Sequence, residues 1–218
     1  MTPLTTDELF GGEPVISFDR ETDRRSFLRW AGVIGAGSAL VASGALNGAS
    51  AFAAPASSFG KGDVGILNYA LTLEYLEYTF YATGLSRGLL KGRDLELVTP
   101  IRSHENQHVK AVTAAVKAAG GTPVAKPKFT IPAKAFSSAD NFLATAVQFE
   151  ELGVTAYHGQ VPLIKSLDIL AAAASIAGVE SRHAAILESL TNGTPFPAPV
   201  EKHRSMSQVV AIIKPYLG

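Results

Sequence analysis

The sequence contains no cysteine among its 218 residues. Disulfide bonds and thiolate metal ligands are therefore excluded, and zinc fingers and other soft-metal sites are excluded with them. The chain also has no excess of either charge, since 19 Lys and Arg balance 19 Asp and Glu. A neutral chain gives no indication of a nucleic-acid partner or of an anionic membrane surface, and we expect no nucleic acid to bind.

The remaining composition is that of a globular protein. Hydrophobic residues make up 47% of the chain and charged residues 17%, which is enough apolar material for a proper core. The length allows one domain and a processed segment.

Residues 1–53 do not resemble part of a fold. The stretch Asp23–Arg29 (DRRSFLR) resembles the twin-arginine export motif. It is followed by a weakly hydrophobic stretch and then by small residues that allow cleavage after Ala51 or Ala53. We expect a twin-arginine signal peptide at 1–53, followed by a linker at 54–62. The protein would then pass through the twin-arginine translocase to the periplasm or the extracellular space. The alternatives are an amphipathic or buried N-terminal helix and an uncleaved membrane anchor, for which so many Gly and Ala residues are poorly suited.

Two Glu-x-x-His pairs, Glu105 with His108 and Glu180 with His183, interrupt apolar runs of helical period. Residues three apart share one face of a helix, so each carboxylate points the same way as its imidazole. A charge on the buried face of a helix needs a partner, and a metal ion is the partner that helical bundles bind with this spacing.

The chain contains an internal repeat that includes these pairs. Residues 73–81 can be laid over residues 149–157, with Glu74 on Glu150 and Tyr81 on Tyr157. From the single Glu to the paired Glu the gap is 31 residues in the first half (74 to 105) and 30 in the second (150 to 180). This duplication predicts two helical hairpins of the same design.

Periodicity and capping signals predict an all-α fold, a four-helix bundle over 63–192 with one long crossover between helices two and three. A Pro-rich link and a short amphipathic helix follow in 193–218. The predicted helices run from Asp63 as N-cap to about Ser86, from Thr99-Pro100 (or, less firmly, Asp94) to Gly120, from Ser138 to before Pro162, from Ser166 to Thr191, and from Ser205 to Tyr216.

Two hairpins packed about a pseudo-two-fold axis would bring four carboxylates and two imidazoles together. These donors suit two iron or manganese ions better than copper or structural zinc, and they leave coordination positions open for O2 or peroxide. A buried polar network without metal is the alternative, although four carboxylates would then repel one another. The predicted ligands are Glu74, Glu105, His108, Glu150, Glu180 and His183.

Residues 60 to 192 resemble the ferritin-like superfamily, whose bundle carries a Glu, a Glu-x-x-His, a Glu and a second Glu-x-x-His in this order. The chain is most similar to the exported bacterial branch, which includes proteins described as desiccation-related. The resemblance implies that the six residues above are ligands, with Glu105 and Glu180 bridging two metal ions. It also implies that Tyr81 and Tyr157 are candidate catalytic residues, which hydrogen-bond ligand carboxylates or are oxidised.

We therefore expect an exported di-iron or di-manganese oxidoreductase of the ferroxidase or peroxidase type. O2, peroxide or Fe(II) would be its reaction partner in stress protection. The alternatives are a non-enzymatic structural or stress protein, in which the metal is a staple or absent, and iron sequestration in an oligomer. The sequence leaves open whether the chain forms a homo-oligomer.

Two neighbouring residues, Glu77 and His104, have roles that the pattern does not decide. Glu77 follows Glu74 by three residues on the same face and is an alternative ligand, a residue behind the ligands, or a surface residue, because its repeat counterpart is Gly153. His104 should face a neighbouring helix or solvent, and we do not expect it to be a ligand.

Overall fold

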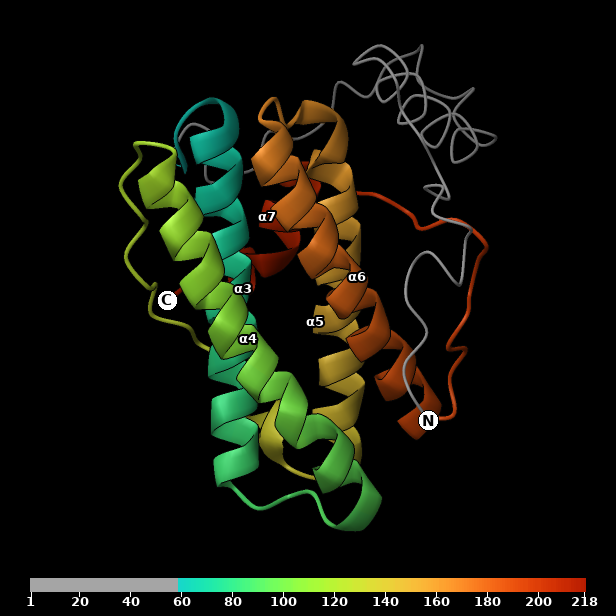
Figure 1. Cartoon of the computed structure of the whole chain (residues 1–218). Coiled ribbons are helices and arrows are strands. Elements are labelled where there is room, and N and C mark those ends of the chain that lie inside the picture. Colours follow the sequence, from blue (N-terminus) through green and yellow to red (C-terminus); the bar gives the residue numbers. More distant parts are fainter. Residues whose placement is uncertain (1–58) are drawn as a thin grey trace, which may run out of the picture. The chain divides into compact units, whose positions relative to one another are not determined.

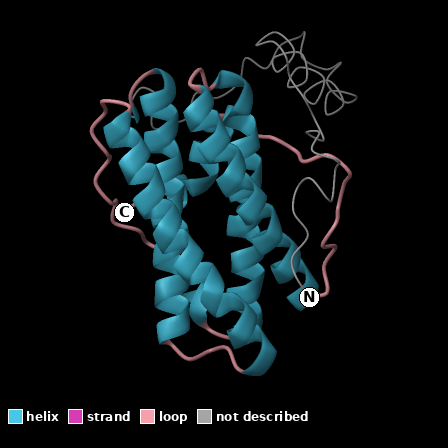
Figure 2. Ribbon diagram, in the orientation of Figure 1, coloured by secondary structure: helices cyan, strands magenta, loops and turns pink. Residues whose placement is uncertain are grey.

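The computed structural model describes residues 59–218, so the predicted signal peptide at 1–53 lies outside the described residues. The described part forms five α-helices and confirms the predicted all-α bundle with a short C-terminal helix (Figures 1 and 2). The helices are α3 (Gly62–Ser86), α4 (Gly92–Ala118), α5 (Ala139–Gln160), α6 (Leu167–Leu190) and α7 (Met206–Ile213). Within residues 59–218, no helix is long and apolar enough to cross a membrane.

The bundle is built from two helical hairpins, α3 with α4 and α5 with α6, and contacts of α3 with α5 and of α4 with α6 join them. The chain from α4 to α5 runs along the bundle and includes a short 3-10 helix, η2 (Ala133–Phe136) (Figure 1). Asn68 on α3 holds this crossover in place, because its side chain accepts from the backbone N–H of Val124 at 3.0 Å and donates to the carbonyl of Thr122 at 3.1 Å. The long crossover is therefore confirmed.

Serine caps set the starts of three helices. The hydroxyl of Ser138 accepts from the N–H of Asn141 at α5, and Ser166 does the same for α6. Ser205 forms a full capping box with Gln208 at α7. These caps satisfy backbone N–H groups that have no partner inside the helix, which is why the sequence located these starts correctly.

The firmer of the two predicted starts of the second helix, Thr99-Pro100, was wrong, whereas the other, Asp94, lies two residues from the observed start. α4 begins at Gly92, and Thr99 lies inside it and donates its hydroxyl to the carbonyl of Leu95 at 2.6 Å. Pro100 is exposed, so water can pair with the carbonyl that its missing N–H leaves free. Val98 is fully buried in the core, and that burial stabilises the turns before the proline.

Asp63 is not the N-cap of α3 either, since Lys61 occupies that position. The carboxylate of Asp63 accepts instead from the backbone N–H groups of Lys165 and Ser166, at 3.0 and 2.8 Å. It therefore ties the start of α3 to the start of α6, where a negative charge is favourable.

The core consists of two apolar clusters at different heights of the bundle. One is rich in aromatic residues around Phe80 and Phe142 and includes the buried face of α7, so α7 contributes to the core. The other contains Leu71, Val112 and Ala177. The predicted ligands on α3, α4 and α6 lie between residues of the two clusters along each helix, which keeps bulk water away from them.

Candidate metal centre

The structure brings all six predicted ligand side chains together inside the bundle. α3 and α5 each contribute one Glu, and α4 and α6 each contribute a Glu-x-x-His pair whose members share the inward face. All four Glu residues have 0% exposure, and His108 and His183 have 8% and 5%. The residues are Glu74, Glu105, His108, Glu150, Glu180 and His183.

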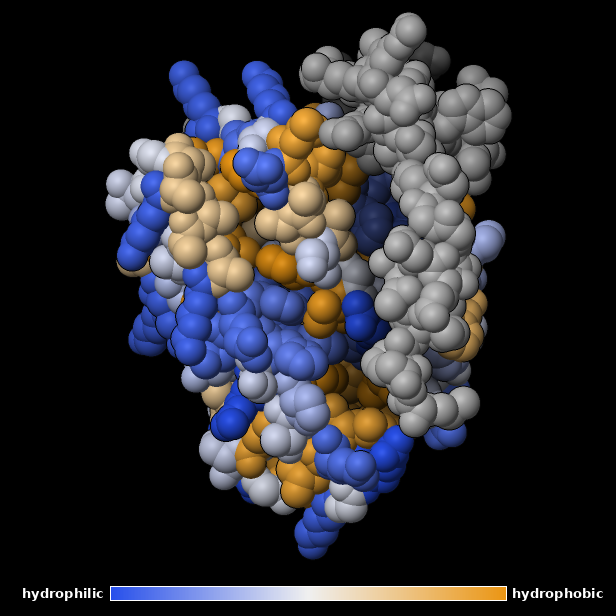
Figure 3. All heavy atoms as spheres, in the orientation of Figure 1, coloured by the Kyte–Doolittle hydropathy of each residue, from blue (hydrophilic) through white to orange (hydrophobic). Residues whose placement is uncertain are grey.

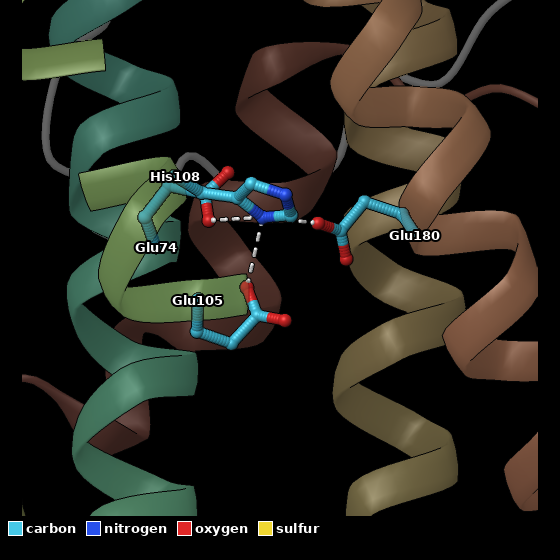
Figure 4. Close-up of side chains that lie close together, drawn as sticks. All are labelled: Glu74, Glu105, His108 and Glu180. Atoms are coloured by element: carbon cyan, nitrogen blue, oxygen red, sulfur yellow. Dashed lines mark hydrogen bonds and ion pairs between the residues drawn. The ribbon is translucent and has the colours of Figure 1, made fainter. Parts of the chain in front are cut away.

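The first group of ligands surrounds Nδ1 of His108 (Figure 4). This nitrogen lies 2.9 Å from Oε1 of Glu180, 3.2 Å from Oε2 of Glu105 and 3.4 Å from Oε2 of Glu74. Three carboxylates from three different helices therefore converge on one imidazole nitrogen.

The second group surrounds Nδ1 of His183 in the same way. It lies 3.0 Å from Oε1 of Glu105, 3.3 Å from Oε2 of Glu150 and 3.9 Å from Oε2 of Glu180. Glu105 and Glu180 thus belong to both groups, and each directs one oxygen toward His108 and the other toward His183. A carboxylate whose two oxygens face different imidazoles can bind two cations at once.

Two buried tyrosines hold the carboxylates that are not shared, and each reaches across to the other hairpin. The hydroxyl of Tyr81 on α3 donates to Oε1 of Glu150 at 2.6 Å. The hydroxyl of Tyr157 on α5 donates to Oε1 of Glu74. Each of these Glu residues therefore keeps its second oxygen directed at an imidazole. The two halves of the sequence repeat therefore form equivalent tyrosine–carboxylate contacts.

The protein's own donors do not satisfy this centre. The Nδ1–H of His108 is aligned with Glu105, and that of His183 with Glu150. Oε2 of Glu74, Oε1 of Glu105 and both oxygens of Glu180 are buried without a hydrogen bond. Buried carboxylate oxygens without donors are costly, so the residues present fit the binding of cations between them. Carboxylate and imidazole are donors that iron and manganese accept.

The protonation of the centre without metal follows from the same crowding. Burial raises the pKa of Glu180 well above its ordinary value, and the charges of Glu105 and Glu150 raise it further. Burial also raises the pKa of Glu74, to about 7. Burial opposes the charge on the imidazoles, but hydrogen bonds and charges of the surrounding carboxylates outweigh it and raise the pKa of His108 to about 12 and of His183 to about 9. Protonated imidazoles therefore supply the positive charge when no metal is bound.

Glu105 behaves differently from the other acids. Burial opposes its charge, but its contacts with the protonated imidazoles of His108 and His183 outweigh burial and lower the pKa of Glu105 to about 2. It is therefore ionised at any physiological pH.

His104 lies outside the ligand set but contacts it. Its Nδ1 is 2.9 Å from Nε2 of His183, and the two rings stack with their centroids 5.2 Å apart. Since Nδ1 of His183 faces the carboxylates, its Nε2–H is free to donate to His104 and so to fix the orientation of the ring. His104 faces a neighbouring helix, which is one of the two environments predicted for it. No signal in the sequence indicated the contact with His183.

Glu77 is the residue that the sequence left undecided, and the structure excludes a surface position. Its side chain is buried, with 4% exposure, on the same face of α3 as Glu74. Its neighbour across the bundle is Gly153, its counterpart in the repeat.

A cavity of about 50 Å³ adjoins the centre. It is almost entirely apolar, and Tyr157, which donates to Glu74, forms part of its wall. The space exists because several of the side chains that line it are small, among them Ala111 and Ala115 on α4 and Ala173 on α6. Figure 3 shows apolar side chains along the upper seam between α4 and α6 on the displayed face. The cavity has room for a small uncharged molecule.

Comparison with known proteins bears on the fold. A family model described as a ferritin-like domain matches residues 62–193. Among solved structures, the chain is similar to a conserved hypothetical protein from Mycobacterium tuberculosis, with a TM-score of 0.53 and 20% identity, over 62% of this chain and 94% of that one. At this identity the likeness concerns the fold alone. The chain matches none of the curated proteins compared with it.

Proposed function

The chain belongs to the ferritin-like domain family, and from this premise we propose that it binds two iron or manganese ions and uses them for redox chemistry on O2, peroxide or Fe(II). The observation that carries the proposal is the division of Glu105 and Glu180 between two imidazoles. Each carboxylate presents one oxygen to His108 and the other to His183, so the ligands form two groups with two shared members.

Charge supports two divalent ions. The six ligands carry four negative charges when the carboxylates are ionised and the imidazoles neutral, and two divalent cations balance them. Without cations, burial and, after it, repulsion from neighbouring carboxylates raise the pKa values of Glu74 and Glu180.

The positions of the residues support a role for each of them. Glu105 and Glu180 would help to hold both ions, His108 with Glu74 would hold one ion, and His183 with Glu150 would hold the other. When bound, the two ions would supply the electrons that reduce O2 or peroxide. Tyr157 and Tyr81 donate to Oε1 of Glu74 and Oε1 of Glu150 and so stabilise these carboxylates. Burial raises the pKa of both tyrosine hydroxyls well above its ordinary value, so they keep their protons.

The surroundings of the centre suit this chemistry. The apolar clusters on either side exclude water. The apolar cavity beside Tyr157 admits small neutral molecules such as O2 and disfavours charged ones.

We also propose that the protein is exported through the twin-arginine pathway and acts in stress protection, as in the desiccation-related branch. The motif at Asp23–Arg29 supports export. N-terminal sequencing of the protein secreted by its native host tests this, and a mature N-terminus after Ala51 or Ala53 is the expected result. Retention in the cytoplasm with an intact N-terminus would contradict it.

The redox proposal is tested on protein purified from its native host. Elemental analysis should find two iron or manganese ions per chain; many iron atoms per chain would indicate sequestration instead. Anaerobic Fe(II)-loaded protein mixed with O2 or peroxide should change its absorption rapidly. The change should be lost in Glu180→Ala and kept in Glu151→Gln, which removes a charge from α5 outside the ligand set.

The same experiment separates catalysis from a structural role. If the metal raises the melting temperature while oxidation stays at the rate of free Fe(II), the centre is a structural staple and the redox proposal is wrong.

A further inference from the structure

The two halves of the centre are not equivalent, because Glu77 has no carboxylate counterpart. Glu77 lies one helical turn after Glu74, with its side chain on the inward face of α3. The repeat that aligns Glu74 with Glu150 aligns Glu77 with Gly153. A fifth buried carboxylate therefore exists on one side of the pseudo-two-fold axis only.

Gly153 provides the space that this carboxylate occupies. A Cβ added at Gly153 would lie 2.9 Å from Oε1 of Glu77, a separation that side chains essentially never show. The same point lies 3.4 Å from Oε2 of Glu180. The carboxylate of Glu77 thus reaches across the bundle to α5, beside the bridging Glu180.

This position places Glu77 beside one of the two ligand groups, although it lies outside the set of ligand atoms that are within 4.8 Å of one another. Oε2 of Glu180 is the oxygen that faces His183, whereas Oε1 faces His108. Gly153 also lies one turn after Glu150, which belongs to the His183 group. Glu77 therefore lies on the side of His183 and Glu150, although it comes from the helix of Glu74.

The surroundings of Glu77 are those of a ligand rather than of a structural ion pair. The charged groups that act most strongly on it are all carboxylates: Glu180, Glu150, Glu74 and Glu105. Among the described residues, no Lys or Arg pairs with it and no hydrogen-bond donor is directed at it. A carboxylate buried in this way gains most from a nearby cation.

Building on the proposed metal centre, we propose that Glu77 is a fifth carboxylate donor, which makes the two metal positions unequal. The ion held by His183 and Glu150 has Glu77 as an additional donor, and the ion held by His108 and Glu74 has none. The first ion is consequently bound more tightly. Because two divalent ions balance only four carboxylates, the fifth negative charge also favours a higher oxidation state at that ion.

The test is a titration of the metal-free full-length protein with Co(II), followed by visible absorption, with equilibrium dialysis for the stoichiometry. Wild-type protein should bind two ions with two separate affinities. Glu77→Gln keeps the side-chain volume and should weaken the tighter site by about 10- to 100-fold, as loss of a group around a metal typically does. The other site should change by less than about 3-fold, the ordinary context-dependent scatter in such effects.

Three variants locate the effect. Glu150→Gln should weaken the same site as Glu77→Gln, and Glu74→Gln should weaken the other site. Glu151→Gln is the matched control, since it removes a carboxylate from α5 next to Glu150 but outside the ligand set, and both affinities should stay as in wild type.

Gly153→Ala tests the same inference without removing a charge, and it remains informative if Glu77→Gln does not fold. Its Cβ would displace the Glu77 carboxylate, so the tighter site should again be the one that weakens. Circular dichroism verifies the fold of each variant.

The outcomes separate the two proposals. Two ions bound by Glu77→Gln with wild-type affinities and spectrum, or an affinity that rises because repulsion is relieved, would overturn the role of Glu77 and leave the metal centre standing. Failure of wild-type protein to bind any Co(II) would overturn the metal centre itself.

Discussion

Metal binding to this centre should release protons. In the metal-free protein the pKa of His108 is about 12 and that of His183 about 9, so both imidazoles are protonated at neutral pH. Their Nδ1 atoms face the carboxylates, and an imidazole nitrogen must lose its proton before it binds a metal. Burial raises the pKa of Glu74 to about 7, so this carboxyl group is about half protonated at neutral pH and adds up to one further proton that the metal displaces.

The size and sign of the effect follow from this count. Each released proton changes the binding free energy by about 1.4 kcal/mol per pH unit. Because rising pH favours the deprotonated ligands, binding strengthens as pH rises. The product of the two association constants should grow about 100-fold per pH unit for two protons and about 1,000-fold for three. The slope should fall by one proton above pH of about 9, where His183 has already lost its proton.

Isothermal titration calorimetry with Mn(II) measures the proton count. Titrations of the full chain at neutral pH, in buffers that differ in heat of ionisation, should give two to three protons released per two ions. His183→Ala should release one proton fewer. His203→Ala, which alters an exposed histidine outside the ligand set, should leave the count unchanged. Two ions bound with less than one proton released would refute the assignment of the imidazoles as ligands.

Further predictions concern stability and the tyrosines. A free metal concentration of about 100 times Kd should stabilise the fold by about 2.7 kcal/mol and raise Tm by roughly 5 to 11 °C in differential scanning calorimetry, reversibly with chelator, whereas an unchanged Tm would argue against binding to the folded state. Tyr81→Phe removes the donor to Glu150 and should weaken one of the two Mn(II) sites about 10-fold in equilibrium dialysis, while Tyr78→Phe should not. Gly84→Ala would place a Cβ 2.0 Å from the ring of Phe142 and should lower the free energy of unfolding in urea by about 1 to 3 kcal/mol. Gly178→Ala has open space around it and should not lower the free energy of unfolding. Equal stability of the two variants would contradict the packing described.

Much of the ligand set could be predicted because a helix has a fixed period. Glu180 and His183 share a face whatever surrounds the helix, and the same holds for Glu105 and His108. The repeat then indicated that each pair has a single Glu on a partner helix. These inferences needed only local geometry and self-comparison, and the structure places the six side chains in one cluster.

Local signals were less reliable where tertiary contacts compete with them. Thr99-Pro100 has the pattern of a helix start, but burial of Val98 in the core extends α4 back to Gly92. Asp63 has the pattern of an N-cap, but its carboxylate accepts from the backbone N–H groups of Lys165 and Ser166. In both cases residues distant in sequence supply the deciding interaction.

By itself, the sequence determined the all-α class, the serine caps, the long crossover and the inward faces of the ligand helices, because each depends on neighbours within a few residues or on the chain's own repeat. Only the tertiary structure decided how Glu105 and Glu180 divide their oxygens, that Tyr81 and Tyr157 cross to the opposite hairpin, and that Glu77 is buried beside Gly153. The reason is physical: helical period sets the direction of a side chain, but its partners depend on how closely two helices approach, and a missing side chain such as that of Gly153 controls that distance.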